Sequence, residues 1–123
     1  MSLKRLAGAL VLASAALTGC SQTKSASVVA KPTLPTTEAS CLARGGSWTS
    51  LGLPMPGKPK TCDLKTTDAG KACTDSNQCE GVCLAPAEAV SGNRATGSCS
   101  AYLANFGNVL LVNDGIVEQI NVE

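Results

Sequence analysis

The longest run of apolar residues lies near the start of the chain, from Leu6 to Ala16. It follows the positive residues Lys4 and Arg5 and precedes small residues, which is the order found in a secretory signal. The run is shorter than the ~20 apolar residues that span a bilayer. It also lacks the 3.6-residue amphipathic pattern of a core helix. Residues 1–19 are therefore predicted to form a signal peptide.

Residues 20–40 have a different character, because from Ser21 to Ser40 the chain is mainly Ser, Thr, Ala, Lys and Pro without an aromatic residue. Such a segment cannot bury enough surface to offset the entropy of ordering. Pro32 and Pro35 favour extended backbone conformations. We expect a disordered tether here, followed by one domain over residues 41–123 that ends in a β-hairpin.

Two hairpins are predicted in that domain. Weak strand patterns at Ser47–Leu51 and Lys60–Leu64 flank a Gly- and Pro-rich loop, Gly52–Pro59. A stronger signal lies at the C-terminus, where β-prone runs at Asn108–Val112 and Ile116–Val122 flank the turn sequence Asn113-Asp114-Gly115.

The terminal hairpin should need support, because isolated hairpins are marginally stable. Period-2 geometry puts Ile116, Ile120 and Val122 on one face, which we expect to pack inward. We expect the hairpin to lie on the cysteine domain or on a third strand around Gly97–Tyr102, with Tyr102 or Phe106 as a candidate anchor. Trp48 is interpreted as a core residue.

Seven cysteines and only three aromatic residues suggest that cross-links replace a rich core. Six cysteines lie in the domain and allow fifteen pairings. We favour Cys41 with Cys62, Cys73 with Cys83, and Cys79 with Cys99. The predicted fold is therefore small, disulfide-rich and mainly β with irregular loops.

The alternative chemistry for these thiols is a metal site, which is disfavoured because the chain has no His and no C-x₂-C spacing. We expect no metal and no cofactor. A catalytic thiol is disfavoured for the same lack of a His base. Acidic residues near the cysteines are interpreted as turn caps and not as an acid/base pair, so no enzyme is expected: Asp63, Asp68, Asp75 and Glu80.

The formal net charge is +1, and removal of Lys4 and Arg5 with the signal leaves one more acidic than basic residue. The remaining basic residues are scattered singly. A clustered basic surface is therefore not expected, which argues against nucleic-acid binding.

The sequence Leu17-Thr18-Gly19-Cys20 resembles the processing box of bacterial lipoproteins at all four positions. The resemblance implies cleavage before Cys20, a diacylglycerol on its sulfur and an acyl group on its amine. It also implies an even number of remaining thiols, which the sequence has. Ser21, not Asp, follows the cysteine, so the resemblance implies the outer membrane, facing the periplasm.

From Cys41 onward the chain resembles a group of small cysteine-rich envelope proteins of bacteria with no established activity. The resemblance rests on Gly45-Gly46-Ser47-Trp48, Asp68-Ala69-Gly70-Lys71-Ala72-Cys73-Thr74-Asp75 and Cys79-Glu80-Gly81-Val82-Cys83. Members of the group carry two further cysteines, at the positions of Asn108 and Asn121 here. Loss of both fits the loss of one whole disulfide.

Three functions remain open. The first is a lipid-anchored, non-catalytic accessory that contacts an envelope protein or the cell wall. The second is an inhibitor of a protease or another envelope hydrolase, which would present Gly52–Pro59 or Ala85–Ala95 as a constrained loop. The third is an enzyme, which would require a concave pocket with converging polar groups.

Overall fold

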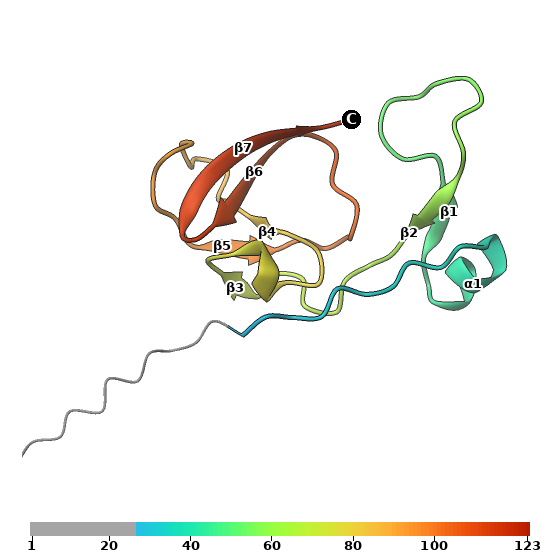
Figure 1. The fold of residues 1–123 in the computed structure, drawn as a ribbon, viewed down its shortest axis with the longest axis horizontal. Helices are drawn as coiled ribbons and strands as arrows, with labels where there is room; N and C mark the ends of the chain where they lie inside the picture. The colour runs from blue at the N-terminus through green and yellow to red at the C-terminus, as the bar shows by residue number, and fades with distance from the viewer. Residues whose placement is uncertain (1–26) are drawn as a thin grey trace, which may run out of the picture.

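The computed structural model describes residues 27–123, which form two small units (Figure 1). The first, the helix–hairpin unit, consists of α1 (Glu38–Ala43), β1 (Ser47–Thr49) and β2 (Thr61–Asp63). The second, the sheet unit, has five strands in the order β3-β5-β4-β6-β7, all paired antiparallel. Its elements are β3 (Ala72–Cys73), the short 3₁₀ helix η1 (Ser76–Gln78), β4 (Cys83–Leu84), β5 (Gly97–Cys99), β6 (Gly107–Asn113) and β7 (Ile116–Val122). The predicted fold class is confirmed.

Helix α1 is short because its start and end signals lie close together. The Thr37 side chain caps its N-terminus by accepting a bond from the Ser40 N–H, and Glu38 favours the first turn. Gly45 ends the helix with φ of 74° and donates its N–H to the Leu42 carbonyl. Cys41 is the buried residue of α1, so the helix faces the core mainly through its disulfide.

The segment from residue 27 to residue 40 differs from the disordered tether that the sequence predicted. The Val29 N–H donates to the Asn77 carbonyl at 2.8 Å, and the Arg44 guanidinium donates to the Thr33 carbonyl at 2.6 Å. The segment runs along the sheet unit and then enters α1 (Figure 1). Hydrogen bonds from main-chain groups and a few long side chains hold the segment in place. These contacts need no apolar pattern, which explains why the sequence did not predict an ordered segment. The predicted signal and Cys20 lie outside the described residues.

The two hairpins occur where the sequence predicted them. Trp48 pairs with Cys62 in the first hairpin, although its strands have three residues each and are shorter than expected. The terminal hairpin pairs Asn113 with Ile116 across a two-residue turn, in which Asp114 and Gly115 have φ of 49° and 75°. Positive φ at both positions is the type I′ geometry, whose twist matches that of paired strands.

The prediction that the isoleucine face of the terminal hairpin packs inward is wrong. Val117 is 1% exposed, whereas Ile120 on the opposite face is 38% exposed. Val112, the cross-strand partner of Val117, is fully buried against the cysteine core, and this contact decides the orientation. The isoleucine face has more apolar residues, but it does not face the disulfides.

The hairpin lies on the cysteine domain, and a strand forms at Gly97–Cys99 in the same sheet, but that strand is not its direct neighbour and neither aromatic residue anchors it. The hairpin pairs with β4 through Leu84 and Leu111, and β5 lies one strand further away. Tyr102 and Phe106 are 42% and 39% exposed, so neither ring anchors the hairpin in a core.

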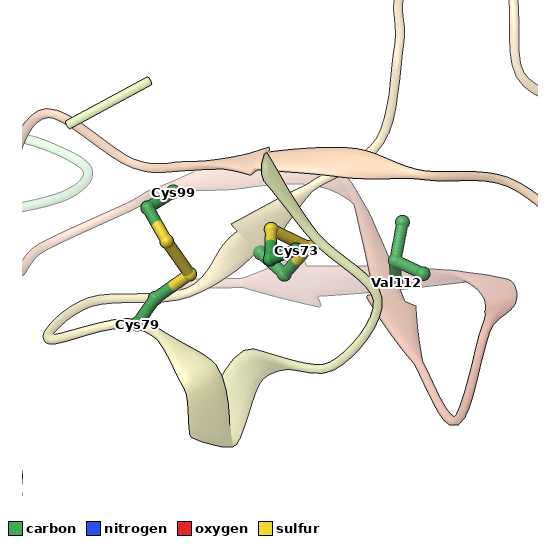
Figure 2. Close-up of a cluster of buried hydrophobic side chains, with 5 residues drawn as sticks. Cys73, Cys79, Cys99 and Val112 are labelled. Carbon is green, nitrogen blue, oxygen red and sulfur yellow. A yellow bond between two sulfur atoms is a disulfide. The ribbon is translucent and has the colours of Figure 1, made fainter. Parts of the chain in front are cut away.

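Both cores consist largely of disulfide sulfur. In the helix–hairpin unit Cys41, Cys62 and Leu64 are buried, and Trp48 packs against them while half-buried. In the sheet unit the buried cluster contains four cysteines and Val112. Figure 2 shows the Cys79–Cys99 disulfide beside Cys73, with Val112 near them on β6.

Main-chain hydrogen bonds join the two units. The Leu103 N–H donates to the Leu64 carbonyl at 3.0 Å, and the Thr66 N–H donates to the Ala101 carbonyl at 3.0 Å. The Leu103 side chain also packs on the core of the helix–hairpin unit. The segment after β5 therefore returns to cover the first unit.

Candidate functional site

The three disulfides have the pairing that the sequence analysis favoured: Cys41–Cys62, Cys73–Cys83 and Cys79–Cys99. Their Cα–Cα distances are 5.5, 5.9 and 5.4 Å, within the range usual for disulfides. The latter two bridges are crossed in sequence, and both lie within the sheet unit.

Three sulfur atoms of these crossed bridges, those of Cys73, Cys79 and Cys99, lie within 4.8 Å of one another. Such proximity resembles the ligand set of a metal. Each sulfur is bonded to another sulfur, however, and thiolates are what bind metals. Packing of two adjacent disulfides accounts for the cluster.

Asp75 caps two segments of backbone. Its carboxylate accepts the Asp114 N–H at 2.9 Å and the Asn77 N–H at 2.7 Å. These two hydrogen bonds, the one from Asp114 first, lower the pKa of the Asp75 carboxyl below its ordinary value. Asp75 therefore ties η1 to the turn of the terminal hairpin.

Glu80 has a similar structural role. Its carboxylate accepts bonds from the Thr67 hydroxyl and the Thr67 N–H, and the two lower its pKa in that order. The Glu80 N–H in turn donates to the Asp68 carboxylate at 2.9 Å. Asp63 accepts the Ala104 N–H at 3.4 Å. All four acidic residues singled out by the sequence thus accept backbone N–H groups in the described chain.

The two carboxylates with a lowered pKa, Asp75 and Glu80, each line a hollow. One, of about 240 Å³, is lined by Asp75 with Asp114 and neighbouring residues of η1. The other, of about 350 Å³, lies between the two units and is lined by Glu80 together with Arg44 and Lys65. In each hollow the pKa of the carboxylate is lowered, whereas a general acid at neutral pH needs a raised pKa.

A cradle for an ammonium group was missed by the sequence analysis. The Lys31 ammonium donates to the carbonyls of Ser76 at 2.8 Å, Cys79 at 2.6 Å and Gly81 at 2.5 Å. These carbonyls surround the start of the Cys79–Cys83 segment, which the disulfides shape. A single Lys in a Ser- and Pro-rich segment forms no sequence pattern from which this role could be predicted.

The loop between β1 and β2 exposes two apolar side chains. Leu53 and Met55 are each 66% exposed. The Lys58 N–H donates to the Met55 carbonyl at 3.3 Å, and Gly57 has φ of 75°. With Pro56 before that glycine, the four residues form a type II turn.

Further contacts fix the same loop. The Ser50 hydroxyl donates to the Lys58 carbonyl at 3.1 Å, and the Lys58 ammonium donates to the Leu53 carbonyl at 3.2 Å. A Cβ at Gly52 would lie 3.2 Å from the Phe106 ring, so the loop base also lies against the sheet unit. The loop is held at its base and exposed at its tip.

The second candidate loop, Ala85–Ala95, contains two turns. The Ala89 N–H donates to the Pro86 carbonyl and the Asn93 N–H donates to the Val90 carbonyl. Val90 is 61% exposed, and the loop lines a hollow of about 240 Å³. Its end is bound to β7 through Asn93 and Val117.

No protein-family model, curated protein or solved structure matches the chain. In the described part of the chain, no helix has the length and apolar character needed to cross a membrane. Asn108 and Asn121, the positions of the extra cysteines implied by the resemblance, are direct cross-strand partners in the terminal hairpin.

Proposed function

We propose that the protein is a lipid-anchored, non-catalytic interaction module of the bacterial cell envelope. The observation that carries the proposal is the β1–β2 loop, Gly52–Pro59, which exposes Leu53 and Met55 while its backbone is fixed. An ordered loop loses little conformational entropy on binding, and apolar side chains gain from burial in a partner.

The position of the loop supports the same proposal. The described chain begins at residue 27 beside η1, while the β1–β2 loop projects from the opposite side of the molecule (Figure 1). An anchor that precedes residue 27 would therefore join the described chain on the side opposite the loop.

The anchor itself is proposed at Cys20, as diacylglycerol on the sulfur and an acyl group on the amine. Six of the seven cysteines take part in the three disulfides, and Cys20 is the seventh. Two or three acyl chains, each contributing ~0.8 kcal/mol per buried CH₂, hold a protein on a membrane permanently. We place it at the outer membrane, facing the periplasm.

A photoreactive amino acid at position 55 in the full chain tests the interaction. In intact cells, the proposal predicts one discrete adduct with an envelope protein or with cell-wall material. The matched control is the same group at Val90, which is similarly exposed on the other loop. Adding Leu53→Asp should abolish the adduct at position 55. Equal labelling at both positions, or an adduct insensitive to Leu53→Asp, would contradict the proposal.

Inhibition of an envelope hydrolase is the second candidate, because a fixed exposed loop next to a disulfide is also what inhibitors present. Leu53 and Met55 each precede a proline, and both peptide bonds therefore lie in constrained backbone. The purified full chain should then inhibit one member of a hydrolase panel at micromolar concentration, and Met55→Asp should remove the inhibition. No inhibition across the panel would eliminate this candidate.

Membrane attachment is tested separately by Cys20→Ser in the full chain. The proposal predicts that the variant leaves the lipid-modified fraction and retains its signal peptide, whereas Ser21→Ala stays processed and membrane-bound. Mass spectrometry of the N-terminal peptide reads both. A wild-type chain without acyl groups would reject the anchor and leave the loop proposal untouched.

A further inference from the structure

Strand β7 lies at the margin of the five-stranded sheet, with β6 as its one neighbour within the sheet (Figure 1). Asn113 and Ile116 close a two-residue turn as a hydrogen-bonded pair. The antiparallel alternation then directs the N–H and C=O groups of Ile116, Glu118 and Ile120 toward β6. Those of Val117, Gln119 and Asn121 point outward.

The hydrogen bonds of Val117 confirm this assignment. Its N–H donates to the Asn93 carbonyl at 2.8 Å, and its carbonyl accepts the Gly92 N–H at 2.8 Å. Arg94 and Ile116 form an isolated bridge beside them. The loop segment 92–95 therefore covers the first outward-facing residue of β7 and ends there.

The next two outward-facing residues, Gln119 and Asn121, are open. Within residues 27–123, no group outside the hairpin forms a hydrogen bond with their backbone. Both residues are exposed, and between them Ile120 is 38% exposed. An exposed strand edge of this kind is a template for another strand.

We infer that this open edge binds a second copy of the chain, by antiparallel pairing of β7 with β7 about a two-fold axis at Ile120. In this register Gln119 faces Asn121 of the second copy, and the reverse. Each open N–H and C=O then has a partner, which gives about four backbone hydrogen bonds.

The side chains suit the same register. Ile120 faces Ile120 of the second copy at a non-hydrogen-bonded position, where Cβ atoms lie about 4.5 to 5.5 Å apart, so the two exposed isoleucines cover each other. Glu118 faces Val122 of the second copy, which avoids a direct pair of like charges. Gln119 and Asn121 amides face each other and can hydrogen-bond.

The covered residue sets the extent of the pairing. In this register Glu123 would face Val117 of the second copy, whose outward groups the loop already occupies. The pairing therefore ends where segment 92–95 begins, without displacement of that loop. A pairing this short buries less than the ~1,600 Å² of a standard interface, so the dimer should be weak and is best detected by covalent trapping.

The test is cysteine cross-linking of the full chain in the cells that express it. Ile120→Cys should give a disulfide-linked homodimer under mild oxidation, because the introduced thiols face each other at the two-fold axis. Val90→Cys is the matched control, since it is more exposed but lies off the edge. It should remain at least tenfold less cross-linked.

A second substitution separates edge pairing from collision. Asn121→Pro, added to Ile120→Cys, removes an outward N–H and leaves the β6–β7 hydrogen bonds in place. It should reduce the cross-linked dimer at least fivefold, while non-reducing peptide mapping still finds the three native disulfides. Absence of the Ile120→Cys homodimer, a cross-link to a different protein, or insensitivity to Asn121→Pro would overturn the inference.

Discussion

The helix–hairpin unit and the sheet unit each have a small apolar core and differ in the number of disulfides that stabilise it. The first has one disulfide and one fully covered aliphatic residue, Leu64. The second has two crossed disulfides and the buried pair Val112 and Val117. The bridges Cys41–Cys62 and Cys79–Cys99 close nearly equal loops, with separations of 21 and 20 residues. Their denatured-state contributions are therefore equal, about 3 kcal/mol each.

Two disulfides that close loops of similar length nevertheless differ in how much structure remains when each is removed. Removal of a bridge from the sheet unit leaves a second bridge and seven residue pairs in the terminal hairpin. Removal of the bridge from the helix–hairpin unit leaves a six-residue helix and a hairpin of three residue pairs. Elements of that size do not fold alone.

The largest expected effect follows from this difference. Cys41→Ala with Cys62→Ala should unfold residues 38–63 and leave the sheet unit folded, as read by amide hydrogen exchange with mass spectrometry. The reverse control, Cys79→Ala with Cys99→Ala, should cost about 2 to 5 kcal/mol in the sheet unit without unfolding it completely. Loss of protection in both units of the first variant would contradict the claim that the sheet unit folds without the Cys41–Cys62 disulfide.

A new bridge should strengthen the sheet unit further. Asn108 and Asn121 are paired at a non-hydrogen-bonded position of the hairpin, where Cα atoms lie about 4.5 Å apart, within disulfide range. Asn108→Cys with Asn121→Cys should raise its free energy of unfolding by about 2 to 3 kcal/mol in chemical denaturation. The diagonal control, Asn108→Cys with Gln119→Cys, should not form a bridge. A gain from the diagonal pair would refute the register.

The terminal hairpin and the mainly β fold could be predicted because both rest on local sequence patterns. Asp114 and Gly115 suit positive φ. The favoured cysteine pairing agrees with the three disulfides, but the number of thiols by itself leaves fifteen pairings open. The inward face could not be predicted, because it depends on the packing of Val112, the cross-strand partner of Val117, against disulfides distant in sequence. A local pattern does not contain that contact.

The Lys31 contact was equally beyond sequence reasoning, since its acceptors are carbonyls 45 to 50 residues away. The exposed β1–β2 loop was identified as a candidate from its prolines and glycines. The type II turn within it also follows from Pro56-Gly57. The approach of its base to Phe106 does not, because it depends on how the two units pack.

The Lys31 cradle gives a smaller test of the sheet unit. Lys31→Met should release residues 27–35 at a cost of about 1 kcal/mol, since charge-assisted hydrogen bonds are lost at an exposed site. Faster hydrogen exchange of the Val29 amide, which donates to the Asn77 carbonyl, would report the release. Lys60→Met, which removes the same charge beside β2, should leave that amide unchanged. Equal exchange in both variants would argue against the cradle.

The smallest expected effect is the contribution of Asp75 to the pH dependence of stability. Because hydrogen bonds lower the folded-state pKa of Asp75, its stabilising contribution is present above the unfolded pKa of about 3.9 and is lost as the pH falls through the lower folded value. Denaturation at pH 7 and pH 3 should show that Asp75→Asn reduces stability at pH 7 by about 0.5 to 1 kcal/mol and flattens its acid dependence. Glu88→Gln, on the exposed loop, serves as the control. An unchanged acid dependence in Asp75→Asn would contradict the cap.

The measurement that tests the account most directly is non-reducing peptide mapping, by mass spectrometry, of the protein taken from native membranes. The account predicts three linked peptide pairs, Cys41–Cys62, Cys73–Cys83 and Cys79–Cys99, and an N-terminal peptide that begins at Cys20 and carries acyl mass. A bridge between the two units, such as Cys62 with Cys73, or Cys20 found in a disulfide, would contradict it.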